Sequence, residues 1–124
     1  MIDKSNFIKN KMEEIYIALT NNQPNLDELI GEINDLFSSP YKRDAIADNE
    51  TIQSLWFFLF EMFILSDNND VKFDIISAMC DMYIYQANLG VDLSLDNIRF
   101  WRESLKAEES SPEIIDYVDD MLSI

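Results

Sequence analysis

Carboxylates are the side chains through which this sequence could do chemistry. Two short strings place them close enough to hold a cation: Asp67-Asn68-Asn69-Asp70 near the middle of the chain, and Asp116, Asp119 and Asp120 near its end. Such oxygen ligands suit Ca²⁺ or Mg²⁺, but the first string lacks the central glycine and closing glutamate of a calcium loop. The second has no further acidic motif to complete a magnesium site. We therefore expect a turn and a solvated helix face here, and no bound metal.

Other catalytic chemistry finds little support. The sequence contains no histidine, which removes the commonest general base and every nucleophile pair that depends on one. Its single cysteine, Cys80, lies in an apolar helical stretch, where burial would make the thiol less reactive. Two glycines cannot form a phosphate-binding loop. We predict a protein that is not an enzyme and that binds no cofactor.

The charge of the chain is lopsided. Its 124 residues include 24 carboxylates and 9 Lys or Arg, a formal net charge of −15. This charge argues against binding to nucleic acid or to anionic membranes, because phosphates need cations opposite them. A basic protein surface is the natural complement. The plainer explanation is an acidity that serves only solubility or reflects an acidic proteome.

Compartment and topology follow from the same composition. A lone cysteine suits a reducing environment, and the first residues lack the charged-then-apolar order of a signal peptide. The longest apolar run, Leu55 to Leu65, contains Glu61 and is too short to cross a bilayer. We expect a cytoplasmic protein.

Apolar residues at helical spacing, together with capping residues, predict the elements. Few chain breakers are present, with only 2 Gly and 3 Pro. The expected caps are Asn25 with Glu28 in a capping box, Asp48 or Asn49, Ser94 and Ser111, while Gly90 ends a helix. The expected helices cover about 3–20, 26–37, a short segment through Tyr41, Ala45 and Ile46, 50–66 and 70–89. A further helix runs from the Ser94 cap through Leu105, and the last runs from Pro112 through Met121.

These elements predict one all-α domain over residues 1–124, compact, with six to seven helices. The connections are two to six residues long, and short links favour antiparallel neighbours. Stacked helical hairpins stay open as the arrangement. The helix over 50–66 is apolar on nearly every side, so we expect it near the centre.

The carboxylates are organised along the helices. In the second helix, four of them share the face opposite the apolar stripe, and in the last helix another four share the outer face. The chain between Met12 and Tyr41, and again the tail after Lys106, carries no Lys or Arg among its carboxylates. Surfaces built only for solubility normally mix the two signs. The two acidic faces consist of Asp27, Glu28, Glu32 and Asp35, and of Glu113, Asp116, Asp119 and Asp120.

The helix over 70–89 carries a narrow polar strip. Asp70, Asp74, Ser77, Asp81 and Asn88 follow one line along it. Tyr85 flanks that line, and aromatic residues are enriched at binding hot spots. The alternative is that a mostly buried helix simply keeps one side wet. The candidate partner-binding residues are Asp27, Glu28, Glu32, Asp35, Asp70, Asp74, Asp81, Tyr85, Glu113, Asp116, Asp119 and Asp120.

Through the acidic stretches 27–35 and 108–120 and its helicity, the chain resembles the immunity proteins of bacterial effector–immunity systems, including contact-dependent growth inhibition. The resemblance is one of class and assigns no role to an individual residue. It implies a tight complex with one cognate toxin domain, a basic nuclease, at the active site of the toxin or at an adjacent exosite.

Two other functions stay open. A nucleic-acid mimic would arrange carboxylates like phosphates and inhibit a DNA-binding defence protein. This function requires the acidic faces to form one continuous acidic surface. A regulatory adaptor or secretion chaperone would instead expose a large apolar groove. Phe57 and Ile64 are the residues we expect to line such a groove.

Overall fold

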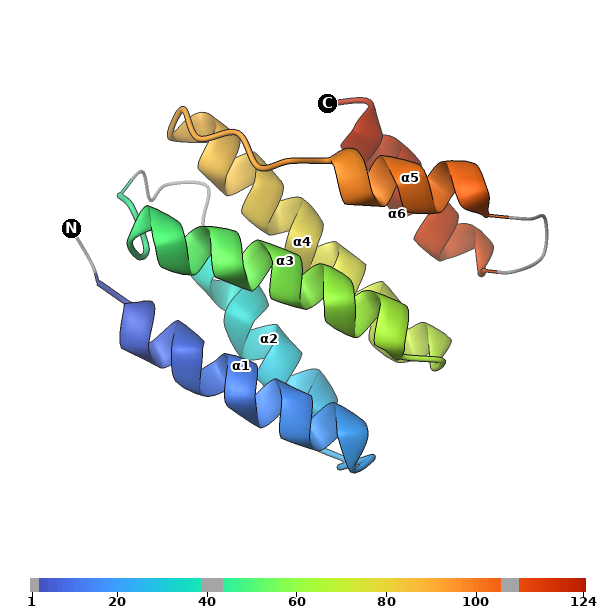
Figure 1. The fold of residues 1–124 in the computed structure, drawn as a ribbon, viewed down its shortest axis with the longest axis horizontal. Coiled ribbons are helices and arrows are strands. Elements are labelled where there is room, and N and C mark those ends of the chain that lie inside the picture. Colours follow the sequence, from blue (N-terminus) through green and yellow to red (C-terminus); the bar gives the residue numbers. More distant parts are fainter. Residues whose placement is uncertain (1–2, 39–43, 106–109) are drawn as a thin grey trace.

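The computed structural model describes residues 3–38, 44–105 and 110–124 (Figure 1). All regular elements in these ranges are helices, which confirms the all-α prediction. The helices are α1 (Ser5–Thr20), α2 (Leu26–Phe37), α3 (Asn49–Leu65), α4 (Asn69–Asn88), α5 (Asp96–Ser104) and α6 (Pro112–Leu122).

Several helix ends are fixed by the residues that the sequence indicates. The Asp48 carboxylate accepts a hydrogen bond of 2.7 Å from the Thr51 amide at the start of α3, and Ser111 does the same for α6. In the turn 66–68, the side chain of Asn68 caps α4. Gly90 adopts a φ of 81° just after α4, a conformation that glycine reaches without strain.

Three local predictions are wrong. Asn25 precedes α2 but makes no side-chain cap, so the capping box with Glu28 is absent. α5 begins later than expected, which puts Leu95 at its N-cap, while the Ser94 hydroxyl accepts a hydrogen bond from the Asp96 amide. Residues 44–48 form no helix, and Tyr41 lies outside the described residues.

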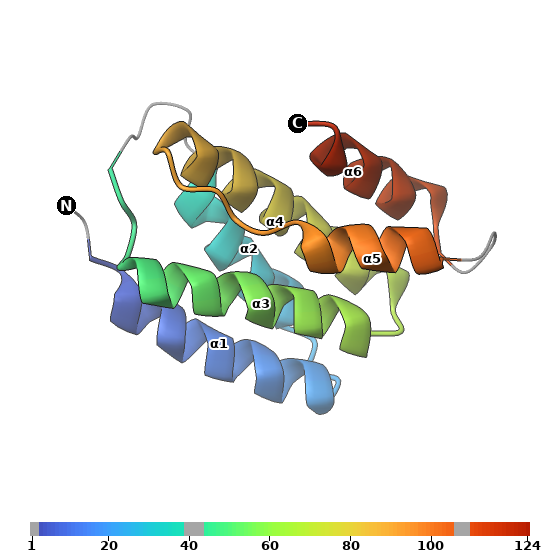
Figure 2. The ribbon, with the colours of Figure 1, turned by 45° about the horizontal axis from the view of Figure 1, so that its top comes forward.

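The helices form three hairpins stacked side by side in two layers (Figure 2). Helices α1, α3 and α5 make up the first layer, and α2, α4 and α6 make up the second. Within a hairpin the two helices run in opposite directions, whereas neighbours within a layer run in the same direction. The arrangement left open by the sequence is therefore the stacked-hairpin one.

The core lies between the two layers. α3 and α4 are the middle helices of their layers, which explains why both are apolar on several sides. Packing and one polar contact join α3 to the third hairpin: the Trp56 indole donates to the Ser94 carbonyl at 2.8 Å, and the Phe63 and Trp101 rings meet edge to face. The most deeply buried large side chains are Trp56, Phe63, Ile8, Ile15, Ile30, Ile33, Ile52, Leu55, Leu59, Ile75, Ile76 and Met79.

Candidate partner-binding surface

Charge is segregated between the two layers. Helices α2, α4 and α6 together carry eleven carboxylates and a single basic residue, Lys72. Helices α1, α3 and α5 interleave their six carboxylates with Lys9, Lys11, Arg99 and Arg102. Because the hairpins stack, the acidic faces of separate helices come to lie in one layer (Figure 2).

Lys72 does not neutralise the second layer. Its amine donates to the Phe63 carbonyl near the end of α3 and lies 4.4 Å from the centroid of the Phe63 ring. Burial lowers the pKa of Lys72, against the opposing effect of Asp67. The lysine thus stabilises the α3–α4 hairpin and leaves the carboxylates of its layer without a cation from α2, α4 or α6.

A groove of about 310 Å³ runs between α2 and α4. Its walls carry Asp27 and Asp35 from α2, and Asp74 and Ser77 from α4. Gly31 lies between the two α2 carboxylates, and a Cβ added there would meet no atom within 4 Å. Helix packing therefore joins the α2 acidic face to the α4 strip, and the glycine keeps the space between them open.

Two carboxylates of α4, Asp74 in the groove and Asp81 further along the helix, lie in environments that disfavour their charge. Burial raises the pKa of Asp74, and the neighbouring Asp27 and Asp70 raise it further. Burial also raises the pKa of Asp81, while the side chain of Asn34 acts in the opposite direction. A cation placed in the groove would relieve the effect on Asp74.

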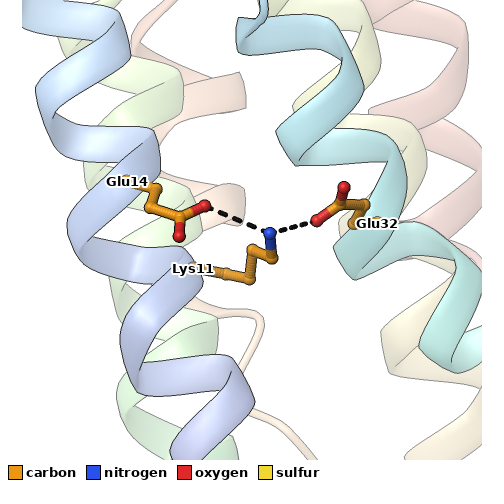
Figure 3. A network of polar contacts seen from close by, with 3 residues as sticks. All are labelled: Lys11, Glu14 and Glu32. Atoms are coloured by element: carbon orange, nitrogen blue, oxygen red, sulfur yellow. Dashed lines mark hydrogen bonds and ion pairs between the residues drawn. The ribbon is translucent and has the colours of Figure 1, made fainter.

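Two of the sequence-predicted residues are engaged inside the molecule. Glu32 forms an ion pair with Lys11 of α1, whose amine also lies 3.1 Å from Glu14 (Figure 3). Hydrogen bonds to Glu32 and then to Glu14 raise the pKa of Lys11. These residues join the layers at the edge of the acidic surface.

The second internal pair is at the other side of the layer. Asp119 on α6 accepts a 2.8 Å hydrogen bond from the guanidinium of Arg102 on α5. Asp119, like Glu32, thus faces a cation of the first layer. Neither residue is as free to meet a partner as its neighbours.

The prediction that Tyr85 offers an exposed aromatic contact is wrong. The residue is only 6% exposed. Its ring meets Phe37 edge to face, and its hydroxyl donates to the Asp44 carbonyl at 2.6 Å. Tyr85 faces the core because α2 covers the side of α4 on which it lies.

The remaining predicted residues lie on three adjacent helices of the second layer, and we term them together the acidic face. On α6, Glu113, Asp116 and Asp120 are exposed, and α6 packs directly on α4, where Phe73 meets Tyr117. None of these carboxylates forms an ion pair with another described residue. The acidic face comprises Asp27, Glu28, Asp35, Asp70, Asp74, Asp81, Glu113, Asp116 and Asp120.

An apolar groove lies in the first layer. Of the two residues that the sequence predicted for such a groove, only Ile64 lines it. Phe57 and Ile64 are exposed on α3, as expected. Ile64 joins Tyr16, Phe60 and Leu65 around a depression of about 400 Å³ at the C-terminal ends of α1 and α3. Tyr16 and Leu65 are not among the residues expected to line a groove, although both are about half exposed. Periodicity alone does not show that the ends of α1 and α3 bring them together.

The first of the two metal-like strings supplies a helix cap. Asn68 caps α4, as an ordinary turn would, and no cluster of three or more potential ligands is found in these ranges. Cys80 is half-buried, which raises the pKa of its thiol. No helix in the described part of the chain has the length and apolar character needed to span a bilayer.

Comparison of the chain with protein-family models, with curated proteins and with solved structures finds no match.

Proposed function

We propose that this protein binds and neutralises a basic protein partner through the acidic face. The observation that carries the proposal is the gathering of carboxylates from α2, α4 and α6 in one layer, with Lys72 turned toward α3. Fields of opposite sign speed association and reject wrong partners. Raised pKa values at Asp74 and Asp81 add to this, because an incoming cation would stabilise both carboxylates.

The partner that we propose is a nuclease toxin domain, which makes the chain an immunity protein. A nuclease must present Lys and Arg to phosphates, so its active-site surroundings are basic. A small helical chain with a broad acidic face complements such a surface. This assignment also rests on the class-level resemblance to immunity proteins.

A nucleic-acid mimic is the second candidate, favoured by the same layer. Since α4 lies between α2 and α6, the three acidic segments occupy adjacent helices. A mimic would use that surface against many proteins that bind DNA, whereas an immunity protein would use it against one toxin. The two functions therefore differ in the number of partners.

Co-purification with the tagged chain from its native host tests this choice. Recovery of one basic nuclease, followed by inhibition of its activity by the purified chain, would support immunity. Recovery of several unrelated DNA-binding proteins would support mimicry instead. Recovery of acidic or neutral partners would contradict both.

A pair of charge-matched variants tests the surface. The triple variant D27N/D35N/D120N removes three charges from the acidic face, and E13Q/E50Q/E103Q removes three from the first layer. We expect the first to slow association with the recovered partner about tenfold and to flatten its salt dependence. The second variant should retain most of the association rate and most of its salt dependence. Stopped-flow or surface plasmon resonance measures both quantities. Equal effects would show that only net charge matters.

A further inference from the structure

Three surface depressions of this molecule are connected through shared residues. The apolar groove at the ends of α1 and α3 includes Leu65, and Leu65 also lines a depression of about 330 Å³ at the hairpin turns. Asp27 lines that second depression and also the acidic groove between α2 and α4. The turns α1–α2 and α3–α4 lie at the same end of the molecule (Figure 1). The three depressions thus follow one another around this end from the first layer to the second, and we term them together the track.

The chemistry of the track changes along its length. At its first-layer end, Tyr16, Ile64 and Leu65 are each about half exposed, at 51%, 48% and 54%. Exposed apolar residues that gather in a depression are typical of interaction sites. At the second-layer end, Asp27, Asp35 and Asp74 form the walls. The track is therefore apolar at one end and acidic at the other.

The apolar end also favours positive charge. Glu61 lies in that groove among the apolar side chains. Helices α1 and α3 both end there, and neither has a basic residue in its last turn. The C-terminal end of a helix carries partial negative charge. A purely apolar ligand would leave these features unsatisfied, whereas one that carries both an apolar side chain and cations would match them.

We infer that the track binds a single basic segment of the partner, in which an apolar anchor residue is followed by lysines or arginines. The anchor occupies the apolar groove beside Leu65, and the cations pass the turns to reach Asp27 and Asp74. This inference rests on the proposed function and names the element of the partner that is recognised. A second copy of this chain does not fit, because it would bring another net charge of −15 onto the same surface.

Selection from a random peptide library displayed on phage, with the full chain as target, tests the inference. We expect enrichment of peptides that combine one aromatic or aliphatic residue with a run of Lys or Arg on one side of it. The best such peptide, labelled with a fluorophore, then serves as the probe in anisotropy titrations.

Two matched pairs of variants locate the probe. L65S should weaken its binding about tenfold, whereas F100S, which removes an exposed apolar residue elsewhere in the first layer, should leave the binding unchanged. D27N/D74N should weaken binding several-fold more than E113Q/D120N, although both remove two charges. All of these positions are exposed or half-buried, and circular dichroism verifies that each variant is folded.

The outcomes separate the inference from the proposed function. Basic peptides without an anchor, or an L65S variant that binds as tightly as F100S, would overturn the track and leave the acidic face as the binding surface. Equal effects of the two charge pairs would overturn the track as well. Failure to enrich any basic peptide would overturn the track, whereas only co-purification without a basic partner would overturn the proposed function.

Discussion

Asp74 illustrates the cost of the acidic groove at the scale of one residue. Burial raises its pKa, and Asp27 and Asp70 raise it further. Asp70 also precedes Asp74 by four residues on α4, and like charges at this spacing destabilise a helix by about 0.2–0.5 kcal/mol. The free protein would be more stable without this carboxylate, as the proposed role of Asp74 in binding a basic partner would require.

The substitution Asp74→Asn should therefore stabilise the free protein. We expect the free energy of unfolding at neutral pH to rise by about 0.5 kcal/mol, or about 2 °C in Tm. A raised pKa means that the folded state binds the proton more tightly than the unfolded state. The penalty is then absent below about pH 4, develops as the pH rises through the folded-state pKa, and is fully present above it.

Thermal unfolding of D74N and the parent at neutral pH and at about pH 3 measures this effect. D92N is the control, because Asp92 is exposed in the loop before α5 and the substitution changes net charge equally. A gain that is equal in D92N, or one that persists at pH 3, would contradict the explanation.

At the scale of elements, Asp48 joins the starts of two helices. Its carboxylate caps α3 through the Thr51 amide and accepts a 2.9 Å hydrogen bond from the Ser5 hydroxyl of α1. Nearby, the Lys4 amide donates to the Ile46 carbonyl at 2.7 Å. Hydrogen bonds from Thr51 and then Ser5 lower the pKa of Asp48. The first and second hairpins are thus held together at this end by polar contacts.

Asp48→Ala should lower Tm by about 4 °C at neutral pH, because α3 loses its cap and α1 loses its attachment. The lowered folded-state pKa means that the contribution of Asp48 is present above the unfolded pKa of about 4 and is lost as the pH falls through the folded value. The Tm difference from the parent should therefore shrink near pH 2. Asp48→Asn keeps a capping oxygen, so its Tm should fall less than that of Asp48→Ala. An equal fall in Tm in the two variants would assign the effect to packing.

Element boundaries were predictable from the sequence because they depend on local chemistry. The Ser111-Pro112 pair starts α6 and Gly90 follows the end of α4, as expected. Asn25 is one exception beside Ser94, since its backbone has a φ of −90° and a ψ of 10° in place of the extended conformation that a capping side chain needs. Local signals thus fix where helices begin more reliably than how each end is satisfied.

Neighbour relations between helices were not predictable. Periodicity shows which side of a helix is buried, but it does not name the helix that covers it. The Lys11–Glu32 ion pair depends on how α1 packs on α2, and Tyr85 is buried because α2 and Phe37 cover that side of α4. For the same reason the acidic strip of α4 was predictable, while the groove that it forms with α2 was not.

At the scale of the whole molecule, stacking three hairpins turns separate acidic helices into one charged layer. In the first layer, α1 and α5 carry Lys and Arg among their carboxylates, whereas the helices of the second layer contain only Lys72, which is turned toward α3. The net charge of −15 is therefore not spread evenly. Repulsion within the second layer should dominate the electrostatic cost of folding.

Salt should stabilise the free protein for this reason. Between about 10 mM and about 500 mM NaCl the screening length falls from about 30 Å to below 10 Å, which removes most repulsion between exposed charges. We expect Tm to rise by about 5 °C over this range. Differential scanning calorimetry, repeated with a neutral osmolyte in place of salt, separates screening from general effects of the co-solute.

The two triple variants show where the repulsion lies. D27N/D35N/D120N should be more stable than the parent at low salt, and its Tm should depend much less on salt. The reason is that it removes three of the carboxylates that repel one another in the second layer. E13Q/E50Q/E103Q carries the same net charge but should keep the dependence, because the carboxylates that it removes lie on helices that also carry cations or few charges. Curves that flatten equally in both variants would mean that repulsion acts through net charge alone. Curves that flatten only in the first would mean that the free protein holds its repulsion on the surface that we assign to the basic partner.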